Sequence, residues 1–230
     1  MSDDRFKRFV GLGFEDFRRM AQDESLSQYG KIGFPDEYRK GSERTIFEDI
    51  LSKLDNLSGT GKTVLDIGPG CSDLPRMLID LCTDHQHTLL LVDSEEMLRH
   101  LPDAKSVKKI AGCYPSCSAL FQEYDRKVDV IVCYSVLHYI FAESNVWEFF
   151  DRSLGLLNSG GQMLIGDIPN VSKRKRFFSS TTGTNFHKQF VGKDEAPRVD
   201  FHVIEPKKID DSVVMALLFR ARSAGFDAYV

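Results

Sequence analysis

Acidic residues and glycines stand at the ends of two short apolar segments, where they suit the binding of a nucleoside. The first segment, residues 63–67, runs into a turn with Gly68 and Gly70, and the absence of a Cβ there lets a ligand approach the backbone closely. Asp66 precedes these glycines, and Asp93 closes the second apolar segment. A carboxylate at the end of that second strand accepts hydrogen bonds from both hydroxyls of a ribose. The pattern predicts a nucleoside-binding crevice.

Four segments resemble, in the same order, the motifs of the class I S-adenosylmethionine-dependent methyltransferases. Residues 64–70 (VLDIGPG) resemble motif I, and residues 91–93 (LVD) resemble motif II. Residues 129–140 (DVIVCYSVLHYI) resemble motif IV of the small-molecule branch, and residues 156–161 (LLNSGG) resemble the turn before the fifth strand. The resemblance implies a Rossmann-like fold, S-adenosyl-L-methionine as cofactor, and methyl transfer to a small molecule as the activity.

The resemblance also implies which residues bind the cofactor. Gly68 and Gly70 would pass beneath the methionine part, Asp66 would lie near its amino group, and Asp93 would bind the ribose. The family often has an acid after the glycine of the adenine turn, and this chain has Cys113 there. The later turns supply the other contacts, which are Gly112, Cys113 and Tyr114 for the adenine, and Tyr134 and Ser135 for the sulfonium.

Two residues at the ends of the fourth and fifth predicted strands are candidates for the catalytic base. Because a histidine ordinarily has a pKa near neutrality, His138 would take a proton from a hydroxyl, or it would only order its loop. Asp167 faces the same crevice, because ligands of open α/β sheets gather at the carboxyl ends of the strands. It would act as a base, or equally as a helix cap or loop anchor.

The acceptor is expected to be a small molecule methylated on oxygen, such as a sugar or a nucleotide-linked metabolite. The basic run 173–176 (KRKR) would clamp an anionic group of such a substrate, although charge runs are usually solvated surface. The Asp/Asn-Pro-Pro-Tyr signature of amino methylation on bases is absent from the sequence. A net charge of −4 also argues against a nucleic-acid partner.

Two alternatives to a methyltransferase stay open. A nicotinamide dehydrogenase has the fingerprint Gly-x-Gly-x-x-Gly, but the sixth position counted from Gly68 is Asp73. An acid in the first turn of the following helix would also repel a pyrophosphate. The other alternative is a non-catalytic protein that binds S-adenosylmethionine or S-adenosylhomocysteine without an acceptor site.

Strands that alternate with helices must position these residues. Apolar runs predict five strands, and continuous apolar strands indicate a sheet covered on both faces, so we expect a doubly wound, mostly parallel α/β fold. Residues 1–60 are expected to form an N-terminal helical cap, with Phe6, Val10, Phe14 and Phe17 on one helical face and residues 28–40 as a mobile connection. Residues 61–230 would form the Rossmann-like domain, with residues 169–206 inserted as a lid. The predicted strands are residues 63–67, 88–92, 107–111, 128–133 and 162–165.

The remaining expectations concern the chain end, metals and location. Residues 226–230 would start the antiparallel hairpin that ends the family's sheet, which leaves this hairpin incomplete. The five cysteines contain no Cys-x-x-Cys pair, so we expect reduced thiols and no metal site. No run approaches the roughly 20 apolar residues of a membrane span, and no signal peptide begins the chain, so we expect a cytoplasmic protein.

Overall fold

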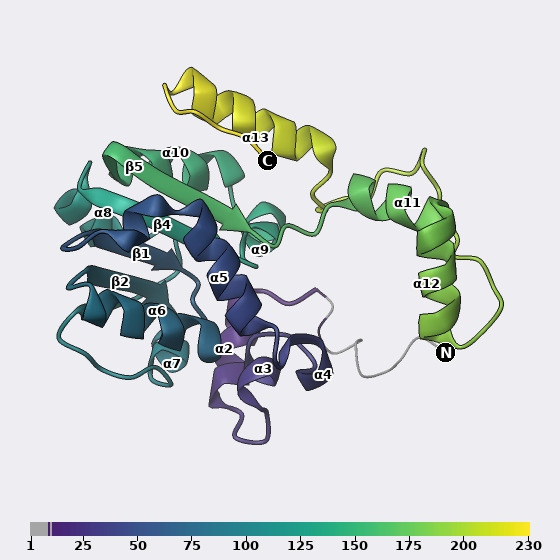
Figure 1. The fold of residues 1–230 in the computed structure, drawn as a ribbon, viewed down its shortest axis with the longest axis horizontal. Coiled ribbons are helices and arrows are strands. Elements are labelled where there is room, and N and C mark those ends of the chain that lie inside the picture. Colours follow the sequence, from purple (N-terminus) through teal and green to yellow (C-terminus); the bar gives the residue numbers. More distant parts are fainter. Residues whose placement is uncertain (1–8, 10) are drawn as a thin grey trace.

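A five-stranded parallel sheet forms the centre of the computed structural model, which describes Phe9 and residues 11–230 (Figure 1). The strand order is β3-β2-β1-β4-β5, so the chain reverses direction across the sheet between β1 and β4. The five predicted strands are confirmed. The main difference is that the fifth strand begins at Leu157, before the predicted start at residue 162. Their bounds are β1 Thr63–Ile67, β2 Thr88–Asp93, β3 Val107–Ala111, β4 Val128–Tyr134 and β5 Leu157–Gly166.

Helices cover both faces of the sheet, as a doubly wound fold requires. Successive side chains of a strand point to opposite faces. Accordingly, Leu65 and Ile67 of β1 pack in one core cluster and Val64 packs in the other. The first cluster includes residues of α8 (Ser118–Tyr124), α9 (Leu137–Glu143), α10 (Val146–Leu156) and α13 (Asp211–Ser223), and the second includes residues of α5 (Glu43–Lys53), α6 (Asp73–Asp84) and α7 (Glu95–Leu98).

Among the described residues, three helices precede α5 and lie beside the carboxyl ends of the strands (Figure 1). They are α2 (Phe14–Gln22), α3 (Gln28–Lys31) and α4 (Asp36–Arg39), and we call residues 13–42 the N-terminal segment. The predicted mobile connection at residues 28–40 is therefore mostly helical. Arg18 attaches α2 to α7 by donating two hydrogen bonds to Glu96, at 2.7 and 3.0 Å. Phe6 and Val10 of the predicted stripe lie outside the described residues.

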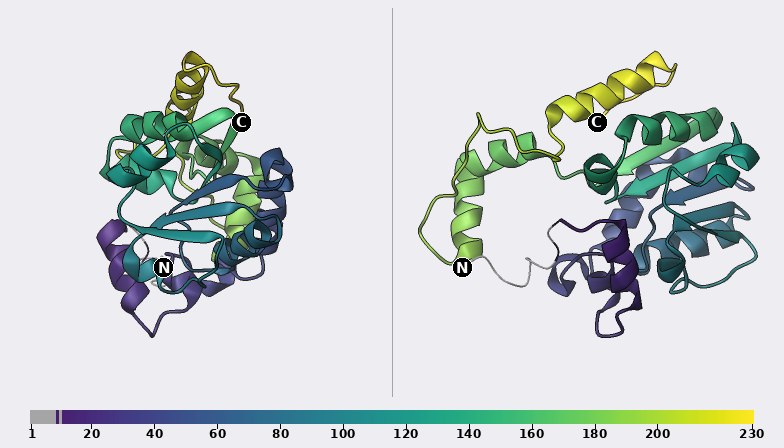
Figure 2. Two further views of the ribbon diagram at one scale, coloured as in Figure 1. Left: turned by 90° about the vertical axis from the view of Figure 1, so that its left-hand side faces the viewer. Right: turned by 180° about the vertical axis from the view of Figure 1, so that it is seen from behind.

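Residues 169–206, which we call the arm, project away from the sheet (Figures 1 and 2). The sequence shows little periodicity here, yet the arm contains α11 (Val171–Ser179) and α12 (Thr181–Val191). Local capping explains both helices. Asn170 and Ser180 accept hydrogen bonds from backbone N–H groups of the first turns, and Gly192 ends α12 in the left-handed conformation.

The chain after α13 does not form the predicted strand. Residues 226–230 have no strand pairing, and Arg222 donates to the carbonyl of Ala228, so the chain turns back beside α13. Phe226 and Ala228 pack against the core cluster there. Within the described residues the sheet is entirely parallel, and β5 pairs only with β4. None of the described helices combines the length and apolar character needed to cross a membrane.

Candidate cofactor-binding site

A cavity of about 300 Å³ lies where the carboxyl ends of β1, β2 and β4 meet the N-terminal segment. This is the place at which open α/β sheets bind their ligands. Eight of the nine predicted cofactor-binding residues line it, which are Gly68, Gly70, Asp93, Gly112, Cys113, Tyr114, Tyr134 and Ser135. The N-terminal segment contributes Phe14, Phe17, Ile32, Phe34 and Arg39, and α9 contributes Tyr139, Ile140 and Glu143.

The turn after β1 requires its two glycines. Gly68 and Gly70 have φ values of +67° and +69°, a conformation that L-residues with a Cβ rarely adopt. A Cβ on Gly68 would lie 2.7 Å from Val136, and one on Gly70 would lie 2.6 Å from Ile32. The glycines therefore let the turn pack between the end of β4 and the N-terminal segment, and their backbone forms part of the cavity wall.

Asp93 is held rigidly at the end of β2. Its carboxylate accepts hydrogen bonds from the backbone N–H of Gly70, at 3.1 Å, and of Ser94, at 2.7 Å. Burial raises the pKa of Asp93 to about 6, although these two hydrogen bonds favour the ionised form. Asp93 is thus ionised at neutral pH, and its remaining lone pairs can accept hydroxyls of a ligand.

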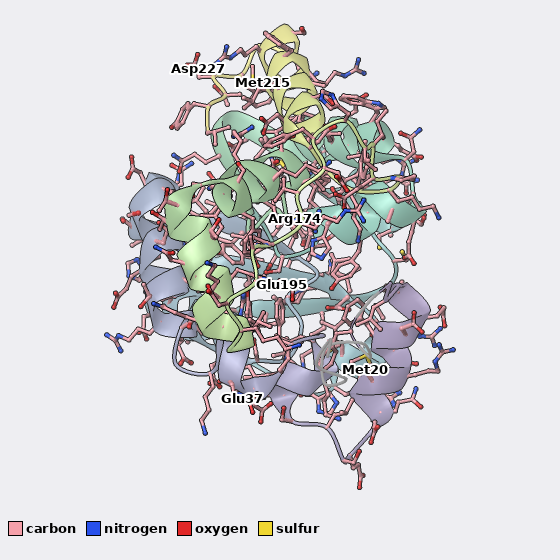
Figure 3. All side chains as sticks on the ribbon, turned by 90° about the vertical axis from the view of Figure 1, so that its right-hand side faces the viewer. Met20, Glu37, Arg174, Glu195, Met215 and Asp227 are labelled. Carbon is pink, nitrogen blue, oxygen red and sulfur yellow. The ribbon has the colours of Figure 1, made fainter. Side chains whose placement is uncertain are left out.

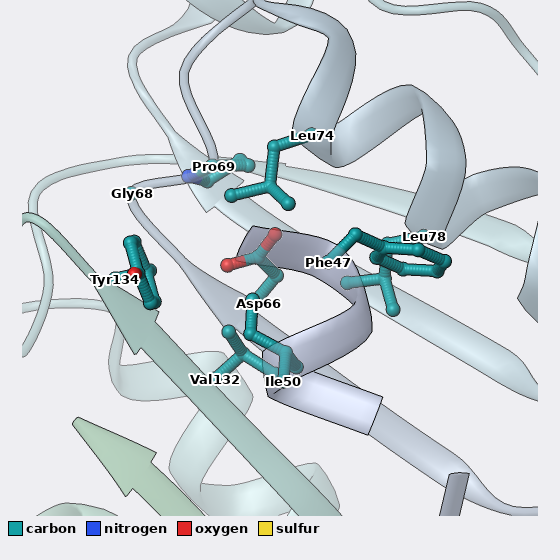
Figure 4. A pocket seen from close by; sticks show the side chains of 9 residues that line it. All are labelled: Phe47, Ile50, Asp66, Gly68, Pro69, Leu74, Leu78, Val132 and Tyr134. Carbon is teal, nitrogen blue, oxygen red and sulfur yellow. The ribbon is translucent and has the colours of Figure 1, made fainter. Parts of the chain in front are cut away.

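Asp66 lies on the other side of the glycine turn from most of the cavity. It shares a sheet face with Val64, and its carboxyl group points into a small pocket lined by Phe47, Ile50, Leu74 and Leu78 (Figure 4). Gly68, Pro69, Leu74 and Tyr134 line both this pocket and the large cavity. Burial first, and then the charge of Asp93, raises the pKa of Asp66 to about 7.

Glu143 brings a carboxylate close to the turn after β3. It lines the cavity at the end of α9, and its negative charge contributes to raising the pKa of the Cys113 thiol, although burial is the main cause. Its Oε2 accepts the backbone N–H of Phe14 at 3.2 Å, so it also anchors the start of α2. No motif in the sequence marks Glu143, because only tertiary packing brings it to Phe14, 129 residues away in the sequence.

Ser135 and Asp167 form a hydrogen-bonded pair at the ends of two adjacent strands. Ser135 Oγ donates to Asp167 Oδ2 at 2.5 Å. Both residues have positive φ values, 60° and 51°, which are uncommon for residues with a Cβ and occur preferentially at functional sites. Ser135 lines the cavity, whereas Asp167 lies directly behind it with its side chain 44% exposed. Ser135 thus connects Asp167 to the wall of the cavity.

His138 is not among the residues that line the cavity. Its ring packs against that of Tyr139 with a centroid distance of 3.9 Å and an interplanar angle of 43°, and its Nδ1 is buried without a hydrogen-bond partner. Burial lowers the pKa of His138 to about 4, while the nearby charge of Asp167 opposes this shift. The imidazole is therefore neutral at pH 7, and it contacts the cavity wall through Tyr139.

Arg39 and Glu43 are two buried charged residues at the site that were not predicted from the sequence. Glu43 Oε2 accepts the backbone N–H groups of Asp73 and Leu74, at 2.8 and 3.1 Å, and so caps the start of α6. Arg39 ends α4 and lines the cavity. Neither shows a motif in the sequence, since each becomes part of the site only when the N-terminal segment packs against the sheet.

The basic run 173–176 lies on α11 in the arm and does not line the cavity. Arg174 and Lys175 pair with Glu205, and Arg176 pairs with Asp211 (Figure 3 shows the arm with Arg174 labelled). These charges are thus compensated by neighbouring acids. Among the residues that the structure describes, no group of three or more His, Cys, Asp or Glu side chains is arranged to hold a metal ion.

Comparisons with known proteins agree on the fold. No family model matches the sequence, and no curated protein matches it. The structure of the plantazolicin methyltransferase BpumL in complex with SAH matches with a TM-score of 0.53 at 16% identity, over 96% of this chain and 78% of that chain. A SAM dependent methyltransferase from Aquifex aeolicus matches with a TM-score of 0.49 at 15% identity, over 84% of this chain and 85% of that chain. The match to BpumL shows that the chain has the fold of the class I S-adenosylmethionine-dependent methyltransferases.

Proposed function

We propose that the protein binds S-adenosyl-L-methionine in the cavity and transfers its methyl group to a small molecule. The observation that carries this proposal is the joint placement of Gly68, Gly70 and Asp93 in one cavity wall. The ionised Asp93 suits a ribose, the glycine turn suits an extended chain that passes over it, and Tyr134 and Ser135 lie at the far end. A methyl transfer from an activated donor needs mainly positioning of the two reactants.

Glu43 argues against a dinucleotide as the ligand. In dinucleotide-binding domains the pyrophosphate sits on the free N–H groups at the start of the helix that follows β1. Here the corresponding N–H groups of Asp73 and Leu74 already donate to the buried carboxylate of Glu43. That carboxylate and Asp73 itself would repel a pyrophosphate.

The pair of Ser135 and Asp167 supports a hydroxyl as the acceptor. Asp167 is an acceptor of protons that Ser135 already contacts at 2.5 Å, so a hydroxyl of a small molecule that displaces or joins Ser135 would be deprotonated by Asp167. His138 is the second candidate base. Neither His138 nor Asp167 lines the cavity, but Asp167 accepts a hydrogen bond from the lining residue Ser135, whereas the buried Nδ1 of His138 has no hydrogen-bond partner.

Thermal denaturation with separate ligands tests the cofactor assignment. A ligand that binds the native state raises the melting temperature, so S-adenosylmethionine and S-adenosylhomocysteine should stabilise the protein while NAD should not. Stabilisation by NAD alone would overturn the proposal. Transfer of a labelled methyl group to a set of small alcohols and amines then separates an enzyme from a non-catalytic binding protein and oxygen from nitrogen as the acceptor.

The two candidate bases are separated by substitution once an acceptor is known. Asp167→Asn should lower turnover about 100-fold or more while S-adenosylhomocysteine still binds, because general base catalysis contributes on the order of 10²–10⁴. His138→Ala should keep most of the turnover. A large loss with His138→Ala and none with Asp167→Asn would reverse the assignment.

A further inference from the structure

Arg39 is the one Lys, Arg or His residue among the described residues that line the cavity. Its side chain is only 9% exposed. Asp93 and Glu143, also in the wall, carry negative charge, so Arg39 gives the cavity a single positive end. A guanidinium stays charged at any physiological pH, and a buried charge is costly unless it is paired.

Glu43 and Asp167 pair with the charge of Arg39, but the contacts of the guanidinium are too long to be good hydrogen bonds. Nη1 lies 3.5 Å from Asp167 Oδ2, Nε lies 3.7 Å from Glu43 Oε1, and Nη2 donates to Ser135 Oγ at 3.5 Å. All three distances exceed the roughly 2.7–2.9 Å of a good charge-assisted hydrogen bond. Nε is buried and has no hydrogen-bond partner. The guanidinium therefore has donors available for a ligand.

Aromatic rings fix the position of the guanidinium. The centroid of Phe34 lies 4.9 Å from Arg39 Cζ, and that of Tyr134 lies 5.7 Å from it. Such contacts hold a cation over a ring face. The guanidinium thus stands beside the end of β4, on the side of the cavity opposite to Asp93 at the end of β2.

The distance between these two ends suits an elongated ligand. In the sheet, β1 lies between β2 and β4, so the ends of β2 and β4 are about 10 Å apart. A ligand with a ribose on Asp93 that extends over Gly68 and Gly70 must present its other end to Arg39. An anionic group at that end would complete the hydrogen bonds of the guanidinium.

We propose that Arg39 binds the carboxylate of the amino-acid part of the cofactor and thereby ties α4 to the bound cofactor. The planar fork of a guanidinium binds a carboxylate through two parallel hydrogen bonds. The inference rests on the proposed function, because it takes S-adenosylmethionine as the ligand. It makes the N-terminal segment part of cofactor recognition in addition to being a cover for the cavity.

Two ligands that differ in one carboxylate test this role. S-adenosylmethionine and decarboxylated S-adenosylmethionine are titrated by calorimetry into the wild type, Arg39→Gln, Arg39→Lys and the control Arg44→Gln. Arg44 is an exposed arginine on α5 that pairs with Glu48 outside the cavity. Arg39→Gln should weaken S-adenosylmethionine about 10- to 100-fold, the usual effect of losing hydrogen bonds to a charged group, and should leave the decarboxylated ligand within about twofold.

The lysine variant and amide exchange supply independent readouts. Arg39→Lys keeps the charge but loses the fork, so its affinity for S-adenosylmethionine should lie between those of the wild type and Arg39→Gln. Hydrogen exchange of α4 in the wild type should slow with S-adenosylmethionine and much less with the decarboxylated ligand, since only the first would hold Arg39 in place.

The outcomes separate this inference from the proposed function. An equal loss of both ligands in Arg39→Gln would show a structural role and would overturn the inference alone. Unchanged affinity for both ligands would also overturn the inference alone. Arg39 would then be available to bind an anionic acceptor. A wild type that binds neither ligand would overturn the proposed function and this inference together.

Discussion

The N-terminal segment and the arm are both helical additions to the same sheet, but only the first provides residues to the cavity. Arg39 in the N-terminal segment and Glu43 just after it are buried and contact the ends of the strands or the start of α6. The arm has the longer run of like charge, with five Lys and Arg and no Asp or Glu in residues 171–191. None of its residues lines the cavity, and its acids and bases pair in exposed positions. A few buried charges at the strand ends therefore bear on ligand binding more than a conspicuous charged run does.

The largest expected difference between the regions is in cofactor affinity. Asp93→Ala should weaken S-adenosylmethionine binding by about 100-fold or more, because two hydroxyls lose a charged acceptor. The matched change in the arm is Asp194→Ala, which removes an exposed partner of Lys188. It should leave affinity within about twofold. Calorimetric titration of both variants measures the contrast, and an unchanged affinity in Asp93→Ala would refute the ribose assignment.

A second contrast concerns stability as a function of pH. The pKa of Asp66 is raised to about 7 in the folded protein by burial, above its usual value of 3.8 in an unfolded chain. The folded state therefore holds this proton more tightly, and stability is lost as pH rises from about 4 to about 7. Asparagine does not ionise, so Asp66→Asn removes this loss. Its free energy of unfolding relative to the wild type should therefore be about 2–3 kcal/mol higher at pH 8 than at pH 5.

Urea denaturation of the wild type and Asp66→Asn at the two pH values measures this difference. In the arm, Lys188 lowers the pKa of Asp194, which is the opposite direction. Asp194→Asn should consequently show no gain at pH 8. A gain of equal size at pH 5 and pH 8 for Asp66→Asn would mean that the ionisation of Asp66 is not the cause.

Substitutions at two glycines with the same φ distinguish the cost of a left-handed backbone from the cost of a steric clash. Gly70 near the cavity and Gly192 in the arm both have φ of +69°, but only at Gly70 would a Cβ meet a neighbour, Ile32 at 2.6 Å. Each substitution by Ala should cost about 1–2 kcal/mol for the left-handed conformation. Gly70→Ala should additionally weaken cofactor binding, and adding Ile32→Ala should restore part of it. Equal melting temperatures and affinities for the two single variants would contradict the role of the contact.

The smallest effect is expected from the basic run of the arm. Arg174→Ala with Arg176→Ala removes exposed ion pairs with Glu205 and Asp211. Exposed pairs contribute about 0–1 kcal/mol each, so stability should change little and cofactor affinity should stay within about twofold. A tenfold loss of affinity would show that the arm reaches the cavity in solution, and would remove the distinction between the two regions.

The sequence alone allowed the sheet and the glycine turn to be predicted because both depend on local patterns. Apolar runs give the five strands, and the positions of Gly68, Gly70 and Asp93 at the strand ends follow from them. The helices of the arm were not predicted, since their polar faces give little periodicity and their ends depend on caps such as Asn170 and Ser180.

Only the tertiary structure decided which charges meet at the cavity. Glu43 caps a helix that begins 30 residues later, and Ser135 meets both Arg39, 96 residues earlier, and Asp167, 32 residues later. The turn of the chain after α13 also follows from packing, because Phe226 finds its contacts in the core beside that helix. The local pattern sets the strands and the turns between them. The burial that gives a charge its chemical role arises only when segments distant in the sequence pack together.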